Sequence, residues 1–454
     1  MAETELSLWQ TLKLRRNIVA LMAFLGFLVG YTIRVNLSVA IVSMTQNYSF
    51  TAENGTVYNK TDFDWNPSQK GQILSAFFYG YIMTQLFGGW LGAKFGGGKV
   101  ICIGLFITAL LALVSPIAAN IGVVLFIIIR VLQGIFEGAM FPCNHAIWAN
   151  WSPPHERTRL SSFTFSGSFF GTVVTFPVCG FLADKFGWQA TFYIPGALTI
   201  IWCIVWLIWI SDYPEEDRWI TESELQYLQE TLGQSKRGKQ ISYPWKEFFK
   251  SMPVWAIISS HFCENWGFYT MLTLLPSYIT NSLHYDVQMS GFLSALPFLL
   301  MSITLQIGGI FVDFLRKKEI FTTTQVRKIF NCGAFLIQTV FMLLTIYATS
   351  ALLSIILITV TIGIGAFTWT AFGVNHLDIA PQHASVLMGI SSTFATTSGI
   401  LGPTVAGRII KHETQEEWNL VFFIIAFVYF FGAVFYGIFG SGEVQWWAKE
   451  EQNS

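Results

Sequence analysis

Charged residues are scarce in this sequence. Asp, Glu, Lys and Arg together make up 12% of its 454 residues, and 53% of the residues are hydrophobic. Soluble domains average about 25% charged residues, so this composition indicates an integral membrane protein in contact with the lipid bilayer. The formal net charge of −1 lacks the basic excess of a nucleic-acid binder. We therefore expect no nucleic-acid partner.

Several sequence patterns are also missing. The six cysteines are scattered and form no CxxC pair, so we predict no metal site and no disulfide framework. No Walker A loop is present, and the longest polar stretch is too short for a nucleotide-binding domain, which excludes a primary pump. No HxxxxD motif or nucleophile cluster supports a membrane enzyme. We expect no cofactor, apart from a coupling ion. The N-terminal residues lack a signal-peptide pattern, so the first span is expected to act as the targeting signal.

The sequence contains many long apolar stretches. A helix needs about 20 apolar residues to cross a bilayer. Twelve segments qualify, and the sequence predicts an all-α integral membrane protein with twelve transmembrane helices. They lie near 17–43, 70–92, 99–118, 121–147, 158–183, 189–211, 253–280, 288–314, 327–347, 349–374, 384–410 and 418–440.

A polar stretch divides these twelve spans into two groups of six. We predict an N-terminal six-helix bundle over 1–210, a cytoplasmic central loop over 211–252, and a C-terminal six-helix bundle with a tail over 253–454. The loop contains an amphipathic pattern, ITESELQYLQETL, which predicts a helix. Short motifs recur in the same order in both halves, among them Asn144-His145 and Asn375-His376. This echo indicates two parallel repeats, although Gly and Pro motifs also recur in unrelated membrane helices.

Basic residues and sequons predict the orientation. Lys and Arg cluster before the first span, after the second, fourth and eighth, and in the central loop. The positive-inside rule then places both termini in the cytoplasm. The loop after the first span carries three N-x-S/T sequons, at Asn47, Asn54 and Asn59. Three sequons in one exoplasmic loop predict glycosylation.

Charged residues interrupt the first and the fourth predicted spans. Arg34 interrupts the first span, and Arg130 and Glu137 lie in the fourth. A charge at membrane depth costs roughly 2.5–3.5 kcal/mol on insertion scales, so it usually faces a wet cavity or a partner. Arg130 and Glu137 differ by about 20° around a helix axis and share one face. Two buried cations suggest a cavity that holds an anion, with the guanidinium forks on its carboxylate or phosphate. The alternative is that Arg130 and Glu137 form a permanent pair that packs the bundle.

Four segments carry a family resemblance: YTIRVNLSVAIV (31–42), SAFFYGYIMTQLFGGWL (75–91), RVLQGIFEGAMFPCNHAIWANWSPPHERTRL (130–160) and HFCENWGFYTMLTLLPSYI (261–279). They resemble the anion:cation symporter family of the major facilitator superfamily, which includes sialin, the sodium–phosphate cotransporters and the vesicular glutamate transporters. The nearest branch looks like sialin and the insect inorganic phosphate cotransporters. The glutamate branch has His where Leu74 stands and Arg where Glu264 stands, and both departures argue against vesicular glutamate loading.

The resemblance implies further site residues. In this fold, spans one, four, seven and ten wall the cavity, so His261 and Glu264 of span seven are expected there; a solvated position near the helix start is the alternative. Glu137, His145, His261 and Glu264 are the candidates for coupling H⁺ or Na⁺, although His145 is equally suited to a structural hydrogen bond. Tyr79, Trp266 and Tyr269 are the aromatic candidates for substrate contact.

The segment GGWLGAKFGGGK (88–99) resembles the cytoplasmic loop motif of the superfamily. Ala93 stands where that motif usually has an acidic residue. Looser copies keep the acid as Asp184 and Asp313. Such acids can cap a neighbouring helix or pair with a base in one conformation only, which makes them candidate gate residues. A plain loop contact is the alternative for both.

The sequence therefore predicts a secondary active transporter for a small anion, such as a sialic or hexuronic acid or inorganic phosphate, driven by H⁺ or Na⁺. The competing hypothesis is a receptor or sensor that binds an anion without moving it. We expect a functional monomer. No clean acidic dileucine signal is visible in the N-terminal tail, so the plasma membrane is favoured over lysosomal or vesicular membranes.

Overall fold

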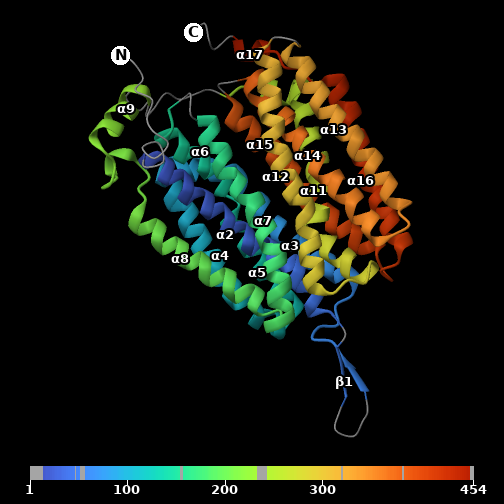
Figure 1. Cartoon of the computed structure of the whole chain (residues 1–454). Coiled ribbons are helices and arrows are strands. Elements are labelled where there is room, and N and C mark those ends of the chain that lie inside the picture. Colours follow the sequence, from blue (N-terminus) through green and yellow to red (C-terminus); the bar gives the residue numbers. More distant parts are fainter. Residues whose placement is uncertain are drawn as a thin grey trace.

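A computed structural model gives the arrangement of the helices (Figure 1). It describes residues 14–46, 48–51, 57–153, 157–232, 243–318, 321–380 and 383–449. The helices of the first bundle are α2 (Arg15–Met44), α3 (Pro67–Phe95), α4 (Gly97–Ile121), α5 (Val123–Glu137) with α6 (Met140–Trp151), α7 (Arg157–Phe186) and α8 (Ala190–Trp209). Those of the second are α11 (Met252–Ser277), α12 (Val287–Lys317), α13 (Thr323–Ile346), α14 (Ala351–Ile379), α15 (Ala384–Ile409) and α16 (Gln415–Phe439).

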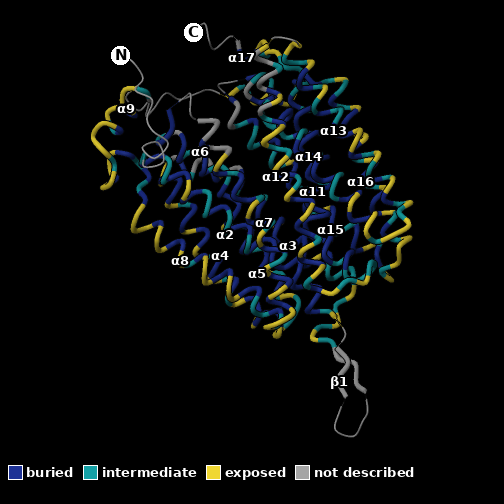
Figure 2. The backbone as a smooth tube through the Cα atoms, in the orientation of Figure 1, coloured by how far each residue is buried: buried dark blue, intermediate teal, exposed yellow. Residues whose placement is uncertain are grey.

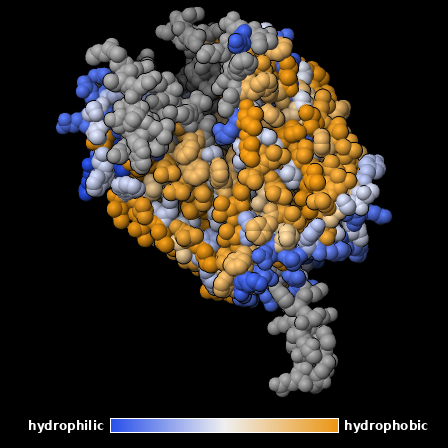
Figure 3. All heavy atoms as spheres, viewed as in Figure 1, coloured by the Kyte–Doolittle hydropathy of each residue, from blue (hydrophilic) through white to orange (hydrophobic). Residues whose placement is uncertain are grey.

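The predicted all-α fold with twelve spans in two six-helix bundles is confirmed, with α5 and α6 forming one interrupted span. Nine of the spans in the described ranges combine the length and apolar composition needed to cross a membrane. The other three, α3, α11 and α15, are as long but richer in polar residues, and α15 packs against both α3 and α11. The outward-facing side chains form a broad apolar surface (Figure 3). The tube of Figure 2 shows the buried positions on the inner sides of the helices.

The short elements lie at the two ends of the bundles. The predicted loop helix is α9 (Glu222–Leu232), which follows a 3₁₀ turn, η1 (Pro214–Glu216). Helices α10 (Trp245–Lys250) and α17 (Trp446–Lys449) and the π-turn η2 (Tyr278–Ser282) were not predicted. An antiparallel hairpin, β1 (Tyr48–Thr51) with β2 (Val57–Lys60), pairs Tyr48 with Lys60 and was also missed. It extends from the end opposite α9 and α17 (Figure 1).

Span boundaries follow from glycine and proline. The third and fourth spans separate at Gly122, rather than at the predicted Ala119-Asn120. The fourth span is interrupted at Gly138 and Ala139, between Glu137 and Met140. Pro142, two residues into α6, has no backbone N–H to donate to a preceding carbonyl, so a continuous helix is disfavoured there. Glu137 consequently lies at the end of a helix, and not in the middle of one.

Small residues bring α3 and α5 into close contact. A Cβ atom on Gly80 would lie 1.9 Å from the Val131 carbonyl oxygen, and one on Gly134 would lie 1.9 Å from the Phe77 carbonyl oxygen. The two backbones therefore touch, as small residues permit in membrane helices. This contact fixes Arg130 and Glu137 of α5 relative to the aromatic residues of α3.

The two bundles meet through α2 with α11, α3 with α15, and α7 with α12. At the hairpin end, Gly71 of α3 packs on Gly407 of α15, with a Cβ on Gly407 lying 3.1 Å from the Gly71 Cα. The Lys70 ammonium lies 3.3 Å from the Glu413 carboxylate at the same end. This end of the seam is tightly closed.

Candidate anion-binding site

Arg34 is a buried cation in an aromatic cage. Its side chain comes from α2, and the residue is 5% exposed. The guanidinium carbon lies between 4.6 and 5.2 Å from the centroids of five rings: Tyr31, Phe77, Phe78, Tyr81 and Tyr269. Cation–π contacts of this kind stabilise a charge that has lost its water. Nη1 donates a hydrogen bond to the Tyr31 hydroxyl at 3.4 Å. Nε and Nη2 have no partner among the described residues, so two directed donors stay open.

Arg130 lies beside Arg34 and is tied to its backbone. Nη1 of Arg130 donates to Gln133 Oε1 at 2.9 Å, and Nη2 donates to the Arg34 carbonyl at 3.1 Å. Its Nε has no partner within the described ranges. No ion pair joins Arg130 to Glu137 in the part of the chain that the structure describes. The alternative, a permanent ion pair between Arg130 and Glu137, is therefore not found in this conformation.

Glu137 is a buried carboxylate at the end of α5. The residue is 2% exposed, and neither carboxylate oxygen has a hydrogen-bond partner in the described segments. A buried charged carboxylate without partners is costly, so this group is suited to exchange a proton or receive a donor from a ligand.

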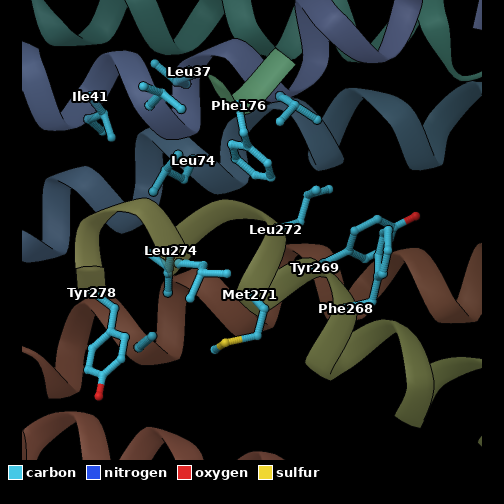
Figure 4. Packing of buried hydrophobic residues seen from close by; sticks show 14 of the residues in the cluster. Leu37, Ile41, Leu74, Phe176, Phe268, Tyr269, Met271, Leu272, Leu274 and Tyr278 are labelled. Carbon is cyan, nitrogen blue, oxygen red and sulfur yellow. The ribbon is translucent and has the colours of Figure 1, made fainter. Parts of the chain in front are cut away.

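A small cavity lies against both arginines at the seam between the bundles. Its walls come from α2, α3, α5 and α11: Arg34, Val35, Leu37, Ser38, Leu74, Phe77, Phe78, Arg130, Leu272 and Thr273. Figure 4 shows Leu37 and Leu74 of the first bundle across from Tyr269 and Leu272 of α11. The space is about that of a water molecule. An organic anion fits only when the helices around it separate, as alternating access requires.

The structure brings only one of the three predicted aromatic residues to the arginines. Tyr269 contacts Arg34, while Trp266 is half-buried and packs on Phe262 at 5.8 Å between ring centroids. Tyr79 is 45% exposed, and Tyr81 takes the place expected for it. The spacing Leu74, Phe77, Tyr81 follows one face of a helix, and this signal could have selected Tyr81.

His261 and Glu264 are buried, at 3% and 1% exposure, so the solvated alternative is wrong. They do not line the cavity. His261 Nδ1 lies 3.2 Å from the Ser391 hydroxyl of α15, and that hydroxyl lies 3.0 Å from His376 Nε2 of α14. Glu264 points into the second bundle, next to Gly365 and Gln338.

The remaining predicted residues lie apart from the cavity or outside the description. Asp184 is exposed and pairs with the adjacent Lys185 at 2.8 Å, and within the described ranges no ion pair joins it to another helix. The side chains of His145, Asp313 and Asn59 lie outside the described part, as do residues Asn47 and Asn54. The roles predicted for them stay predictions.

The sequence missed an acid that does contact the loop motif. Asp212 follows α8, and its Oδ1 accepts hydrogen bonds from the backbone N–H groups of Gly98 (2.6 Å) and Lys99 (3.3 Å) at the start of α4. Burial raises the pKa of Asp212, and the Gly98 N–H group opposes that rise. Asp212 thus caps the N-terminus of α4, within the loop motif in which Ala93 replaces the usual acid. An Asp directly after an apolar span was the available signal.

Comparisons with known proteins identify the family. Residues 19–403 match the model of the Major Facilitator Superfamily. The chain is 41% identical over 444 residues to vesicular glutamate transporter 1 of Xenopus laevis, covering 97% of this chain and 77% of that protein. It is 39% identical to vesicular glutamate transporter 2 of Homo sapiens, covering 97% and 76%.

Solved structures share the fold at low sequence identity. A bacterial homologue of the human lysosomal transporter Spinster, inward-facing and unoccupied, aligns with a TM-score of 0.70 and 14% identity, over 92% of this chain and 97% of that one. A D-xylose–proton symporter aligns with a TM-score of 0.67 and 17% identity, over 93% and 98%. These relatives are transporters and not enzymes. The chain is a multi-pass membrane protein that belongs to the anion:cation symporter family of the Major Facilitator Superfamily.

Proposed function

We propose that the chain is a secondary active transporter that carries a small organic anion, such as a sialic or hexuronic acid, or inorganic phosphate, together with H⁺ or Na⁺. The observation that supports this most is the pair of buried guanidiniums beside a cavity at the seam of the bundles, with donors on both that no described residue uses. Guanidinium forks match carboxylate and phosphate geometry.

The residues divide the work as follows. Arg34 and Arg130 hold the anionic group, and the cage around Arg34 covers the rest of the substrate with apolar and hydroxyl-bearing surface. Glu137 follows Arg130 by seven residues on α5 and is one of the buried carboxylates that can take up the coupling ion. When the bundles rock about the cavity, the anion is exposed first to one side and then to the other.

The relatives named above are named as glutamate transporters, and the resemblance described above implies a difference from that branch at Leu74. It is a wall of the cavity, and the glutamate branch has histidine at that position by the resemblance described above. An apolar wall offers no contact to the ammonium group of an amino acid. We therefore favour anions without an amino group.

Uptake into proteoliposomes tests the function. Labelled phosphate, a sialic acid, a hexuronate and glutamate are supplied at two pH values, with and without Na⁺. Saturable uptake of one anion that equilibrates with the lumen supports transport. Saturable binding with no internal label would instead support the sensor hypothesis.

We further propose a functional monomer with both termini in the cytoplasm and residence in the plasma membrane, although the relatives are named for vesicles. Surface biotinylation tests residence in the plasma membrane. Glycosidase treatment of the protein and of variants at Asn47, Asn54 and Asn59 tests the orientation. A tagged N-terminus accessible from outside intact cells would refute the orientation.

A further inference from the structure

A second polar cluster lies inside the second bundle, away from the arginines. Glu264 of α11 is 1% exposed, and a Cβ on Gly365 of α14 would lie 2.2 Å from its Oε1 and 2.7 Å from Gln338 Nε2 of α13. The Thr368 hydroxyl of α14 also adjoins the carboxylate. Tyr429 of α16 reaches the same face of α11, because a Cβ on Gly267 would lie 1.8 Å from its hydroxyl. Four helices thus surround one carboxylate.

Several polar atoms in this cluster have no hydrogen-bond partner. They are Glu264 Oε2, both amide atoms of Gln338 and the Tyr429 hydroxyl, judged over the residues that the structure describes. Gln338 and Tyr429 are 0% and 1% exposed. Buried polar groups are nearly always paired, so a concentration of such atoms around one acid points to a ligand-binding site.

The chemistry of the cluster suits a positively charged ligand. Arg, Lys and His form no ion pair with Glu264 in the described ranges. Tyr429 is the titratable group facing Glu264 from α16, and α13 and α14 contribute the neutral Gln338 and Thr368. On α11 itself Cys263 is adjacent, while His261 faces Ser391 of α15. A buried carboxylate without a basic partner must bind a proton or a cation, and oxygen donors are what hard cations prefer.

The cluster is separate from the anion cavity but shares a helix with it. Glu264 and the cavity residue Thr273 are nine positions apart on α11, about 180° around its axis. One face of α11 therefore carries Tyr269 and Thr273 toward Arg34, and the opposite face carries Glu264 toward α13 and α16. A movement of α11 changes both environments at once.

We propose that Glu264, with Gln338, Thr368 and Tyr429, forms the binding site of the coupling cation, H⁺ or Na⁺, distinct from the anion site. This inference rests on the proposed transport function and assigns its coupling ion to the second bundle. Occupancy by the cation and occupancy by the anion each favour one position of α11, so each site alters the affinity of the other.

Two transport assays on the Glu264→Gln variant test the assignment. Gradient-driven accumulation needs the cation site, whereas counterflow exchange of labelled for unlabelled anion needs only the anion site. In the wild type, a tenfold cation gradient drives about tenfold anion accumulation for one cation per anion. We expect accumulation by Glu264→Gln to fall to about onefold while exchange persists. Glu416→Gln, an exposed glutamate of α16, serves as the matched control and should behave as the wild type.

Separate arms use a pH gradient and a Na⁺ gradient, and the arm that loses its effect identifies the ion. Gradient-driven accumulation by Glu264→Gln equal to the wild type would overturn the assignment. If Glu264→Gln does not fold, Gln338→Met replaces it; the half-maximal cation concentration should rise at least about fivefold, and an unchanged value would overturn the proposal. Absence of saturable uptake by the wild type would instead refute the transport function.

Discussion

Replacement of Arg34 by lysine separates charge from geometry at the anion site. Lysine keeps the positive charge but removes the planar fork, whose Nε and Nη2 donors are open. A hydrogen bond to a charged group contributes about 1.5–3 kcal/mol. Since about 1.4 kcal/mol corresponds to tenfold in affinity, losing one such bond should raise the KM for the anion about 10- to 150-fold.

Concentration series of labelled anion uptake measure this effect, with surface biotinylation or protein yield as the control for folding. Arg34→Ala should lose uptake entirely, because it removes the charge as well. Tyr79→Phe is the matched control, since Tyr79 is exposed and lies away from the cage. If Arg34→Lys had the wild-type KM, the reasoning from the fork would be wrong.

Three other predictions concern the same bundle. Arg130→Ala should abolish uptake with normal surface expression, because Nη2 ties the Arg34 backbone in place; uptake at the wild-type rate would contradict this. Gly134→Val should prevent stable folding, since even a Cβ would lie 1.9 Å from the Phe77 carbonyl oxygen, and size-exclusion profiles in detergent measure it. Asp212→Ala should remove the cap of α4 and cost about 1 kcal/mol of stability, whereas Asn at this position keeps an acceptor oxygen for the Gly98 N–H group. Burial raises the pKa of Asp212 above the value of about 3.9 expected in the unfolded chain. The free energy of unfolding should therefore fall as the pH rises from about 3.9 through the raised pKa, because the folded state binds this proton more tightly than the unfolded state. The melting temperature of Asp212→Asn should lack that dependence.

The helices were predictable because lipid imposes a simple rule on sequence. A spanning segment must be long and apolar, so each of the twelve segments was placed within a few residues of its observed helix. Arg34 and Arg130 were also predictable, because a charged residue is unexpected in a segment that must be apolar. The break after Glu137 was only partly predictable. Pro142 disfavours a continuous helix, but α5 already ends at Glu137, with Gly138 as its C-cap.

Contacts between helices were harder to predict because they depend on rotation about each axis. Tyr79 and Tyr81 are two positions apart on α3, and the packing of Gly80 on Val131 sets the rotation of α3 at which Tyr81, and not Tyr79, faces Arg34. The direction of Glu264 likewise depends on α13, α14 and α16, which are distant in sequence. Asp212 was missed because its target, the start of α4, lies more than a hundred residues away.

A structure of the purified protein with its transported anion bound tests the central claim most directly. We predict that the anionic group lies within hydrogen-bond distance of Nη2 of Arg34 and Nε of Arg130, in a cavity opened by separation of α11 from α2 and α3. An anion bound elsewhere, with both guanidiniums still enclosed by their present contacts, would contradict the claim.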